Sequence, residues 1–328
     1  MARLSGLARV LLLLAGAGTV AASVPPPPQQ QAPPVFRGRT ETVAVYTSVT
    51  DAAGQPIRTL SREHFRVLDE GRPQELTIFE NGRQPITAML LVDTSASMAV
   101  TLDLARHAAE QFVLRLLPGD RARVGSFSDV VNLSRAFTDD RDSLLRSLRD
   151  DLRIGNPTRL WDAISQTMEA LAGLPGRRVI VLFTDGEDTI STTAPRDVML
   201  RARREDVMIY AVQIRSRALP QVEQQIIGPN MPRRRPQRGD PTPTQVLRSI
   251  SSETGGAHFL LNPSHDVNAT FTQVVAELRH QYLLGFAPGK MDGRTHELRV
   301  SVPDAPQLQV RARRYYQAPL VNNPAGGR

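Results

Sequence analysis

Acidic and hydroxyl side chains follow two apolar segments of the chain. The first segment, residues 89–92, is followed by Asp93, Ser95 and Ser97, and the second, residues 179–183, is followed by Thr184 and Asp185. Short apolar runs that end in turn residues are typical of strands buried on both faces of a parallel sheet. Because ligands of open α/β sheets bind at the carboxyl ends of the strands, we expect these side chains to converge.

A further hydroxyl, that of Thr158, lies in a loop that opens a helical pattern. Each of these features also has a purely structural interpretation, since Ser, Thr and Asp cap helices and Asp185-Gly186 can form a turn. Their occurrence together, in order and at the strand ends of one alternating pattern, favours a shared ligand site over separate caps and turns.

Carboxylate and hydroxyl oxygens are hard donors, which suit Mg²⁺, Mn²⁺ or Ca²⁺. Two carboxylates with three neutral hydroxyls would leave the cation able to accept one more carboxylate from outside. The residues therefore predict a divalent-cation site, most simply for Mg²⁺, that captures an Asp or Glu side chain of a partner protein. Its expected ligands are Asp93, Ser95, Ser97, Thr158 and Asp185.

The sequence offers little support for catalysis. It contains no cysteine, its six histidines show no zinc-hydrolase spacing, and the signatures of serine hydrolases and nucleotide-binding loops are absent. We therefore expect a protein that is not an enzyme. Two alternatives stay open: a metal-dependent hydrolase, in which the metal activates water or Ser95 is a nucleophile, and a purely structural envelope protein without a working metal site.

The first residues of the chain have the features of an export signal. Arg3 and Arg9 precede an apolar stretch with small residues at 20–22, so we expect residues 1–22 to be a signal peptide rather than an uncleaved anchor. Residues 23–35 are rich in Pro and Gln and predict an extended linker. No other stretch is long and apolar enough to span a membrane, so the expected location is the periplasm or the exterior.

The formal net charge of +7 falls to +5 without Arg3 and Arg9, because no acidic residue lies in the first 22 positions. Part of the excess lies in the Pro- and Arg-rich segment 218–243, which is unusually long for a loop inside a compact domain. Since neither interleaved aromatic residues nor a nucleic-acid-binding motif accompanies these arginines, we expect a solvated loop and no nucleic-acid partner.

The alternation of apolar runs and helical periodicity predicts an α/β domain, a doubly wound and mostly parallel sheet, over residues 88–281. Segments 36–87 and 282–318 have the alternation of short strands instead. We expect these two flanks to form one small β domain, followed by a tail at 319–328. The sequence leaves the oligomeric state open.

The segment Asp93-Thr94-Ser95-Ala96-Ser97-Met98 resembles the D-x-S-x-S-M motif of von Willebrand factor A domains. Thr158 and Asp185 resemble the threonine and second aspartate motifs of that family. The resemblance implies a Rossmann-like fold and a metal-ion-dependent adhesion site (MIDAS), in which Ser95, Ser97 and Thr158 touch the metal and the aspartates act directly or through water. The flanks resemble exported acidobacterial-type proteins with such a domain. The loop 218–243 departs from the family pattern and leaves the choice of partner open.

Overall fold

A computed structural model of the protein describes residues 42–214, 241–261 and 267–320. The expected signal peptide, the linker, nearly all of the loop 218–243 and most of the tail lie outside these residues. Within the described segments, no helix is both long enough and apolar enough to cross a membrane.

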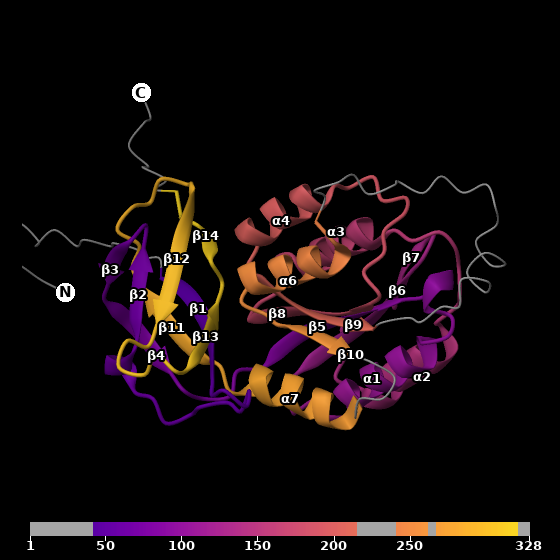
Figure 1. The fold of residues 1–328 in the computed structure, drawn as a ribbon, viewed down its shortest axis with the longest axis horizontal. Helices are drawn as coiled ribbons and strands as arrows, with labels where there is room; N and C mark the ends of the chain where they lie inside the picture. The colour runs from indigo at the N-terminus through magenta and orange to yellow at the C-terminus, as the bar shows by residue number, and fades with distance from the viewer. Residues whose placement is uncertain (1–41, 215–240, 262–266, 321–328) are drawn as a thin grey trace, which may run out of the picture. The chain divides into compact units, whose positions relative to one another are not determined.

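A six-stranded sheet forms the centre of the larger domain, with the strand order β10-β9-β8-β5-β6-β7 (Figure 1). All neighbouring strands are parallel except β7, which pairs antiparallel with β6. The bounds are β5 Ile86–Asp93, β6 Arg121–Phe127, β7 Val131–Leu133, β8 Arg177–Thr184, β9 Val207–Ile214 and β10 His258–Leu261. The chain winds outward from β5 to β7 and then restarts at β8, so the strand order reverses between β5 and β8.

Helices cover both faces of this sheet (Figure 1). One face carries α1 (Leu102–Leu114), α2 (Arg141–Asp150) and α7 (Val267–Arg279), and the other carries α3 (Leu160–Leu171), α4 (Pro195–Arg204) and α6 (Pro243–Glu253). Successive strand residues point to opposite faces, so Leu90 packs in the first layer and Leu91 in the second. Both are fully buried. The expected doubly wound, mostly parallel fold is therefore confirmed.

Helix α6 begins earlier than its apolar pattern, which starts at Val246. The Thr242 hydroxyl accepts a hydrogen bond from the Gln245 amide, and the Gln245 side-chain oxygen accepts one from the Thr242 amide. This reciprocal capping fixes the start of the helix at Pro243, a residue that needs no amide partner in the first turn.

The flanks of this domain form two antiparallel sheets, with the orders β13-β1-β11-β4 and β14-β12-β2-β3. Each sheet mixes strands from the N-terminal flank with strands from the C-terminal flank, which confirms the expected β domain. The bounds are β1 Val43–Thr50, β2 Arg66–Asp69, β3 Arg72–Gln74, β4 Leu76–Glu80, β11 Tyr282–Phe286, β12 Thr295–Ser301, β13 Gln309–Ala312 and β14 Tyr315–Gln317.

A buried polar cluster joins the end of α7 to the β domain. The Glu277 carboxylate accepts hydrogen bonds from Ser48 of β1 at 3.2 Å and from the Tyr210 hydroxyl of β9 at 2.9 Å, and it forms an ion pair with Arg311 of β13. The Gln281 side chain donates to the Ser48 hydroxyl at 2.8 Å. Glu277 is only 2% exposed, so this carboxylate depends on these partners for its hydrogen bonds.

Candidate metal centre

Two aspartates lie at the point where the strand order reverses. Asp93 is the last residue of β5, and Asp185 follows Thr184, the last residue of β8. These two strands are hydrogen-bonded neighbours. Open α/β sheets bind ligands in the crevice outside the carboxyl ends of the strands at such a reversal. The fold thus places both acids where a ligand is expected.

The Asp93 carboxylate is fully buried and rigidly held. It accepts a hydrogen bond from the Ser95 amide at 2.9 Å and one from the Thr184 hydroxyl at 2.6 Å. Thr184 also accepts from the Gly186 amide at 2.9 Å, which orders the turn that carries Asp185. Thr184 therefore links the two aspartates.

Burial, and secondly the negative charge of Asp185, raise the pKa of Asp93 to about 7, although hydrogen bonds from Ser95 and Thr184 oppose the shift. Within the described residues, Asp93 forms no ion pair with Arg, Lys or His. A cation beside these carboxylates would stabilise their charged forms. The electrostatics therefore fit a positively charged ligand.

The hydroxyls of Ser95 and Ser97 lie 3.1 Å apart in the loop after β5. Ser95 precedes a short 3-10 helix, η2 (Ala96–Met98), but its side chain makes no capping hydrogen bond. A structural capping role thus does not account for Ser95, whose buried hydroxyl is directed to Ser97 instead.

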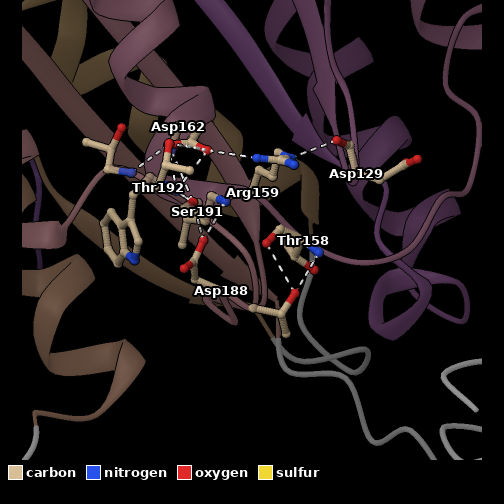
Figure 2. Close-up of polar contacts among 11 residues, drawn as sticks. Asp129, Thr158, Arg159, Asp162, Asp188, Ser191 and Thr192 are labelled. Atoms are coloured by element: carbon tan, nitrogen blue, oxygen red, sulfur yellow. Dashed lines mark hydrogen bonds and ion pairs between the residues drawn. The ribbon is translucent and has the colours of Figure 1, made fainter. Parts of the chain in front are cut away.

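The backbone of Thr158 is held by residues 189–190. Its carbonyl accepts hydrogen bonds from the amides of Thr189 and Ile190 at 3.0 and 3.1 Å. Its amide donates to the Thr189 hydroxyl at 2.8 Å (Figure 2). Three residues earlier, Gly155 donates to the Thr94 carbonyl at 3.0 Å and forms a β-bridge with Ser95. The N-cap of α3 is Arg159 rather than Thr158. The Thr158 loop thus bridges the segments that carry Ser95 and Asp185.

Gly155 allows this close approach. A Cβ atom at this position would overlap the side chains of Ser128 and Asp129. We expect Gly155→Ala to push the loop away from Ser95, lowering divalent-cation affinity about tenfold and stability by ~1–3 kcal/mol, as overpacking does. Isothermal titration calorimetry and thermal unfolding would measure both effects. Gly82→Ala is the matched control, because a Cβ there meets nothing within 4 Å; equal effects of the two variants would contradict this explanation.

The loop after Asp185 caps helix α3 (Figure 2). The Asp188 carboxylate accepts from the Leu160 amide at 2.8 Å and from the Ser191 hydroxyl at 2.5 Å, while Ser191 accepts from the Trp161 amide at 3.0 Å. These bonds satisfy amides of the first helical turn that have no partner within the helix. The segment that carries Asp185 and the helix that follows Thr158 are therefore locked together.

Asp162 of α3 completes this connection from the opposite direction. Its carboxylate accepts from the amides of Thr192 and Thr193 at 3.1 and 2.8 Å and lies 3.3 Å from the Arg159 guanidinium (Figure 2). Burial alone would raise the pKa of Asp162, but the hydrogen bonds from Thr193 and Thr192 outweigh it and lower the pKa to about 2. The charged form of Asp162 is therefore the one that holds this loop.

This pKa predicts acid sensitivity. A folded-state pKa below the unfolded value of 3.8 gives stability that is present above about pH 4 and is lost as the pH falls toward 2. Asp162→Ala should cost ~2 kcal/mol at pH 7, the scale of hydrogen bonds to a charged group, and much less at pH 2. Urea unfolding of both proteins across this range would measure the difference. A cost that does not change with pH would contradict the assignment.

All five residues expected from the sequence thus belong to connected segments at one edge of the sheet. In the described parts of the chain, no group of three or more histidine, aspartate or glutamate side chains is placed to hold a metal ion. Cation binding at this edge would therefore depend on hydroxyl oxygens as well as the two carboxylates. The supporting roles of Thr184, Asp188, Ser191 and Asp162 were not anticipated from their spacing.

Among solved structures, the chain is similar to an aerotolerance-related membrane protein from Bacteroides fragilis (17% identity, TM-score 0.44, covering 59% of this chain and 98% of that one). It is also similar to BatB from Bacteroides thetaiotaomicron (16% identity, TM-score 0.44, covering 59% of this chain and 98% of that one). A third similar structure is proximal thread matrix protein 1 from the mussel byssus, described with a zinc-occupied MIDAS motif. Its sequence identity is 15% and its TM-score 0.45, and the match covers 65% of this chain and 50% of that one.

A search of curated proteins found no match. The model of the von Willebrand factor type A domain family matches residues 89–274, which is more than half of the chain. This match spans the central sheet from β5 to β10 together with the edge that carries the two aspartates. The chain therefore belongs to the von Willebrand factor type A domain family.

Proposed function

We propose that this protein is a metal-dependent protein-binding module that acts outside the cytoplasm. Its MIDAS-like site, formed by Asp93, Ser95, Ser97, Thr158 and Asp185, would bind a divalent cation and through it an acidic side chain of a partner protein. The observation that carries this proposal is the buried Asp93 carboxylate, which lies within electrostatic reach of Asp185 where the strand order reverses.

The five residues have distinct roles in this proposal. Ser95, Ser97 and Thr158 supply neutral oxygens, and Asp93 and Asp185 supply negative charge, either directly or through water. The cation would supply the positive charge to which a carboxylate of the partner binds. We expect Mg²⁺ in the cell, with Mn²⁺ or Ca²⁺ as alternatives, because the donors are all hard oxygens.

The proposed location outside the cytoplasm is supported by the signal-like sequence of residues 1–22. N-terminal sequencing of the protein recovered from the periplasm or the medium tests it directly. A mature chain that starts near Ser23 is the expected result. Recovery of an uncleaved chain from the cytoplasm alone would contradict the proposal.

The binding function is tested by a pull-down from the native cell envelope, carried out with Mg²⁺ and again with EDTA. The wild type should retain a partner only with Mg²⁺, and the Ser97→Ala variant should retain much less of it. Retention of the same partner in EDTA would favour the alternative of a structural envelope protein without a working metal site.

The hydrolase alternative is tested on the purified protein with generic ester and phosphate substrates. We expect no turnover. At this edge, the Gln213 side chain donates to the Asp185 carbonyl at 2.8 Å, and its amide oxygen lies 3.0 Å from the His258 ring. The nearby imidazole is thus engaged in supporting the loop rather than placed as a base. Turnover that is lost in Asp185→Ala would favour the hydrolase.

A further inference from the structure

A cavity of about 170 Å³ lies at the end of the sheet opposite the candidate metal centre. Its walls come from residues 83–86, which lead into β5, and from the C-terminal ends of α1 and α7. The apolar part of the lining consists mainly of Ile86, Phe112, Leu116 and Leu278. These four side chains are buried, so they form a fixed hydrocarbon surface inside the cavity.

Arginines surround this hydrocarbon surface. Arg83, Arg115 and Arg279 line the cavity. Burial lowers the pKa of Arg279; Asp120 opposes this shift, and the charges of Arg83, Arg115 and Arg141 add to it. The guanidinium groups of these three arginines are thus close enough to repel that of Arg279. Among the described lining residues, Asp120 is the one carboxylate.

The hydrogen bonds at the cavity give these arginines no carboxylate partner among the described residues. Both oxygens of Asp120 are occupied by backbone amides, those of Ile86 at 3.0 Å and Leu117 at 2.8 Å. Within the described part of the chain, Arg115 donates to neutral oxygens, including the Gln111 carbonyl at 2.8 Å. The buried Nη2 of Arg279 makes no hydrogen bond with any described residue. A buried donor of this kind calls for an acceptor.

We propose that this cavity binds a small amphipathic oxyanion, a carboxylate or phosphate group on a short hydrocarbon body. The planar guanidinium fork matches the geometry of such oxyanions, and the excess of positive over negative groups favours an anion. The buried apolar wall accommodates the hydrocarbon part. The volume lies below the ~300–1,000 Å³ of pockets for drug-sized ligands, so the ligand is a small one.

Calorimetry with three probes tests the proposal: sodium hexanoate, the neutral 1-hexanol, and inorganic phosphate. All titrations contain EDTA, so that a carboxylate cannot bind through a cation at the other end of the sheet. Hexanoate should bind the wild-type protein at least tenfold more tightly than hexanol or phosphate, and added salt should weaken its binding. Hexanol binding as tightly as hexanoate, or the absence of hexanoate binding, overturns the proposal.

Two variants locate the site. Arg115→Gln and Arg279→Gln should each weaken hexanoate binding at least tenfold, because each removes a charged donor. Arg299→Gln is the control, since this arginine lies on β12 with its side chain 72% exposed, and it should bind hexanoate as the wild type does.

Unchanged binding in both cavity variants overturns the site. Phosphate binding as tight as that of hexanoate overturns the hydrocarbon part of the proposal in favour of a site for inorganic oxyanions. If a cavity variant fails to fold, the hexanol comparison and the salt dependence on the wild type still decide the outcome. None of these results depends on the proposed metal site, because the cation is chelated throughout.

Discussion

We expect the Asp93→Ala variant to lose divalent-cation binding. Residues that merely orient metal ligands cost about 10- to 100-fold in affinity when removed, so a buried carboxylate at the site itself should cost at least about 100-fold. Isothermal titration calorimetry with Mg²⁺ and Mn²⁺ measures this change. Asp103→Ala, which removes an aspartate side chain that is 89% exposed on α1, should leave the isotherm unchanged.

The Asp93→Asn variant separates loss of the ligand from loss of the fold. Its carboxamide keeps an acceptor for Ser95 or Thr184 but carries no charge. Since burial raises the pKa of Asp93 to about 7, the charged carboxylate opposes folding above that pH. In EDTA at pH 8, the variant should unfold at a urea concentration no lower than the wild type. Unchanged isotherms for both Asp93→Ala and Ser95→Ala would remove the site assignment.

Glu277→Ala should produce the largest loss of stability among these predictions, ~3–5 kcal/mol. Removing one partner of a buried ion pair leaves the other partner uncompensated, and this cost exceeds the value of the pair itself. Here Arg311, Tyr210 and Ser48 all lose their shared acceptor. Urea-induced unfolding followed by circular dichroism measures the change in the free energy of unfolding.

Two further variants show how much of that loss comes from the charge and from burial. Glu277→Gln keeps an acceptor for Tyr210 and removes the charge, so its cost should be smaller than that of Glu277→Ala. Glu110→Ala removes an ion pair with Arg149, whose side chain is 60% exposed, and should cost less than ~1 kcal/mol. A similar small cost for Glu277→Ala would mean that the buried cluster contributes little.

The strand ends that carry the candidate site could be predicted from the sequence. The apolar runs before Asp93 and Asp185 are continuous because β5 and β8 are buried on both faces, and no surface strand gives that pattern. The position of Thr158 followed from the helical periodicity that begins at Leu160. Periodicity was therefore sufficient to place the hydroxyls and the acids at one edge.

The support of the site could not be predicted in this way. Asp188 and Ser191 cap a helix that begins 28 to 31 residues earlier, whereas capping patterns in a sequence detect only neighbours within one turn. The arginines of the cavity are similarly far apart, at positions 83, 115 and 279. Contacts made by folding, rather than local spacing, bring each of these sets together.

Some short strands have no signature of their own in the sequence, each for a local reason. Strand β3 has three residues, one of them Pro73, a residue type that strand patterns exclude. Strand β14 also has only three residues, too few to show an alternation. Strand β7 is equally short and ends at Leu133, after which the Ser134 hydroxyl accepts a hydrogen bond from the Val124 amide at 3.3 Å.

The mixing of N- and C-terminal strands in the β domain imposes an order on folding during synthesis. Strand β1 pairs with β11 through Thr47 and Tyr282, so its neighbour in the sheet is made only after the entire larger domain. That domain contains all the strands of its own sheet, so its sheet can form before the C-terminal strands are made. Contacts so distant along the chain form slowly. During translation, β1 and β4, whose neighbours in the sheet are β11 and β13, therefore stay unpaired until almost the whole polypeptide has been made, whereas β2 and β3 can pair with each other early.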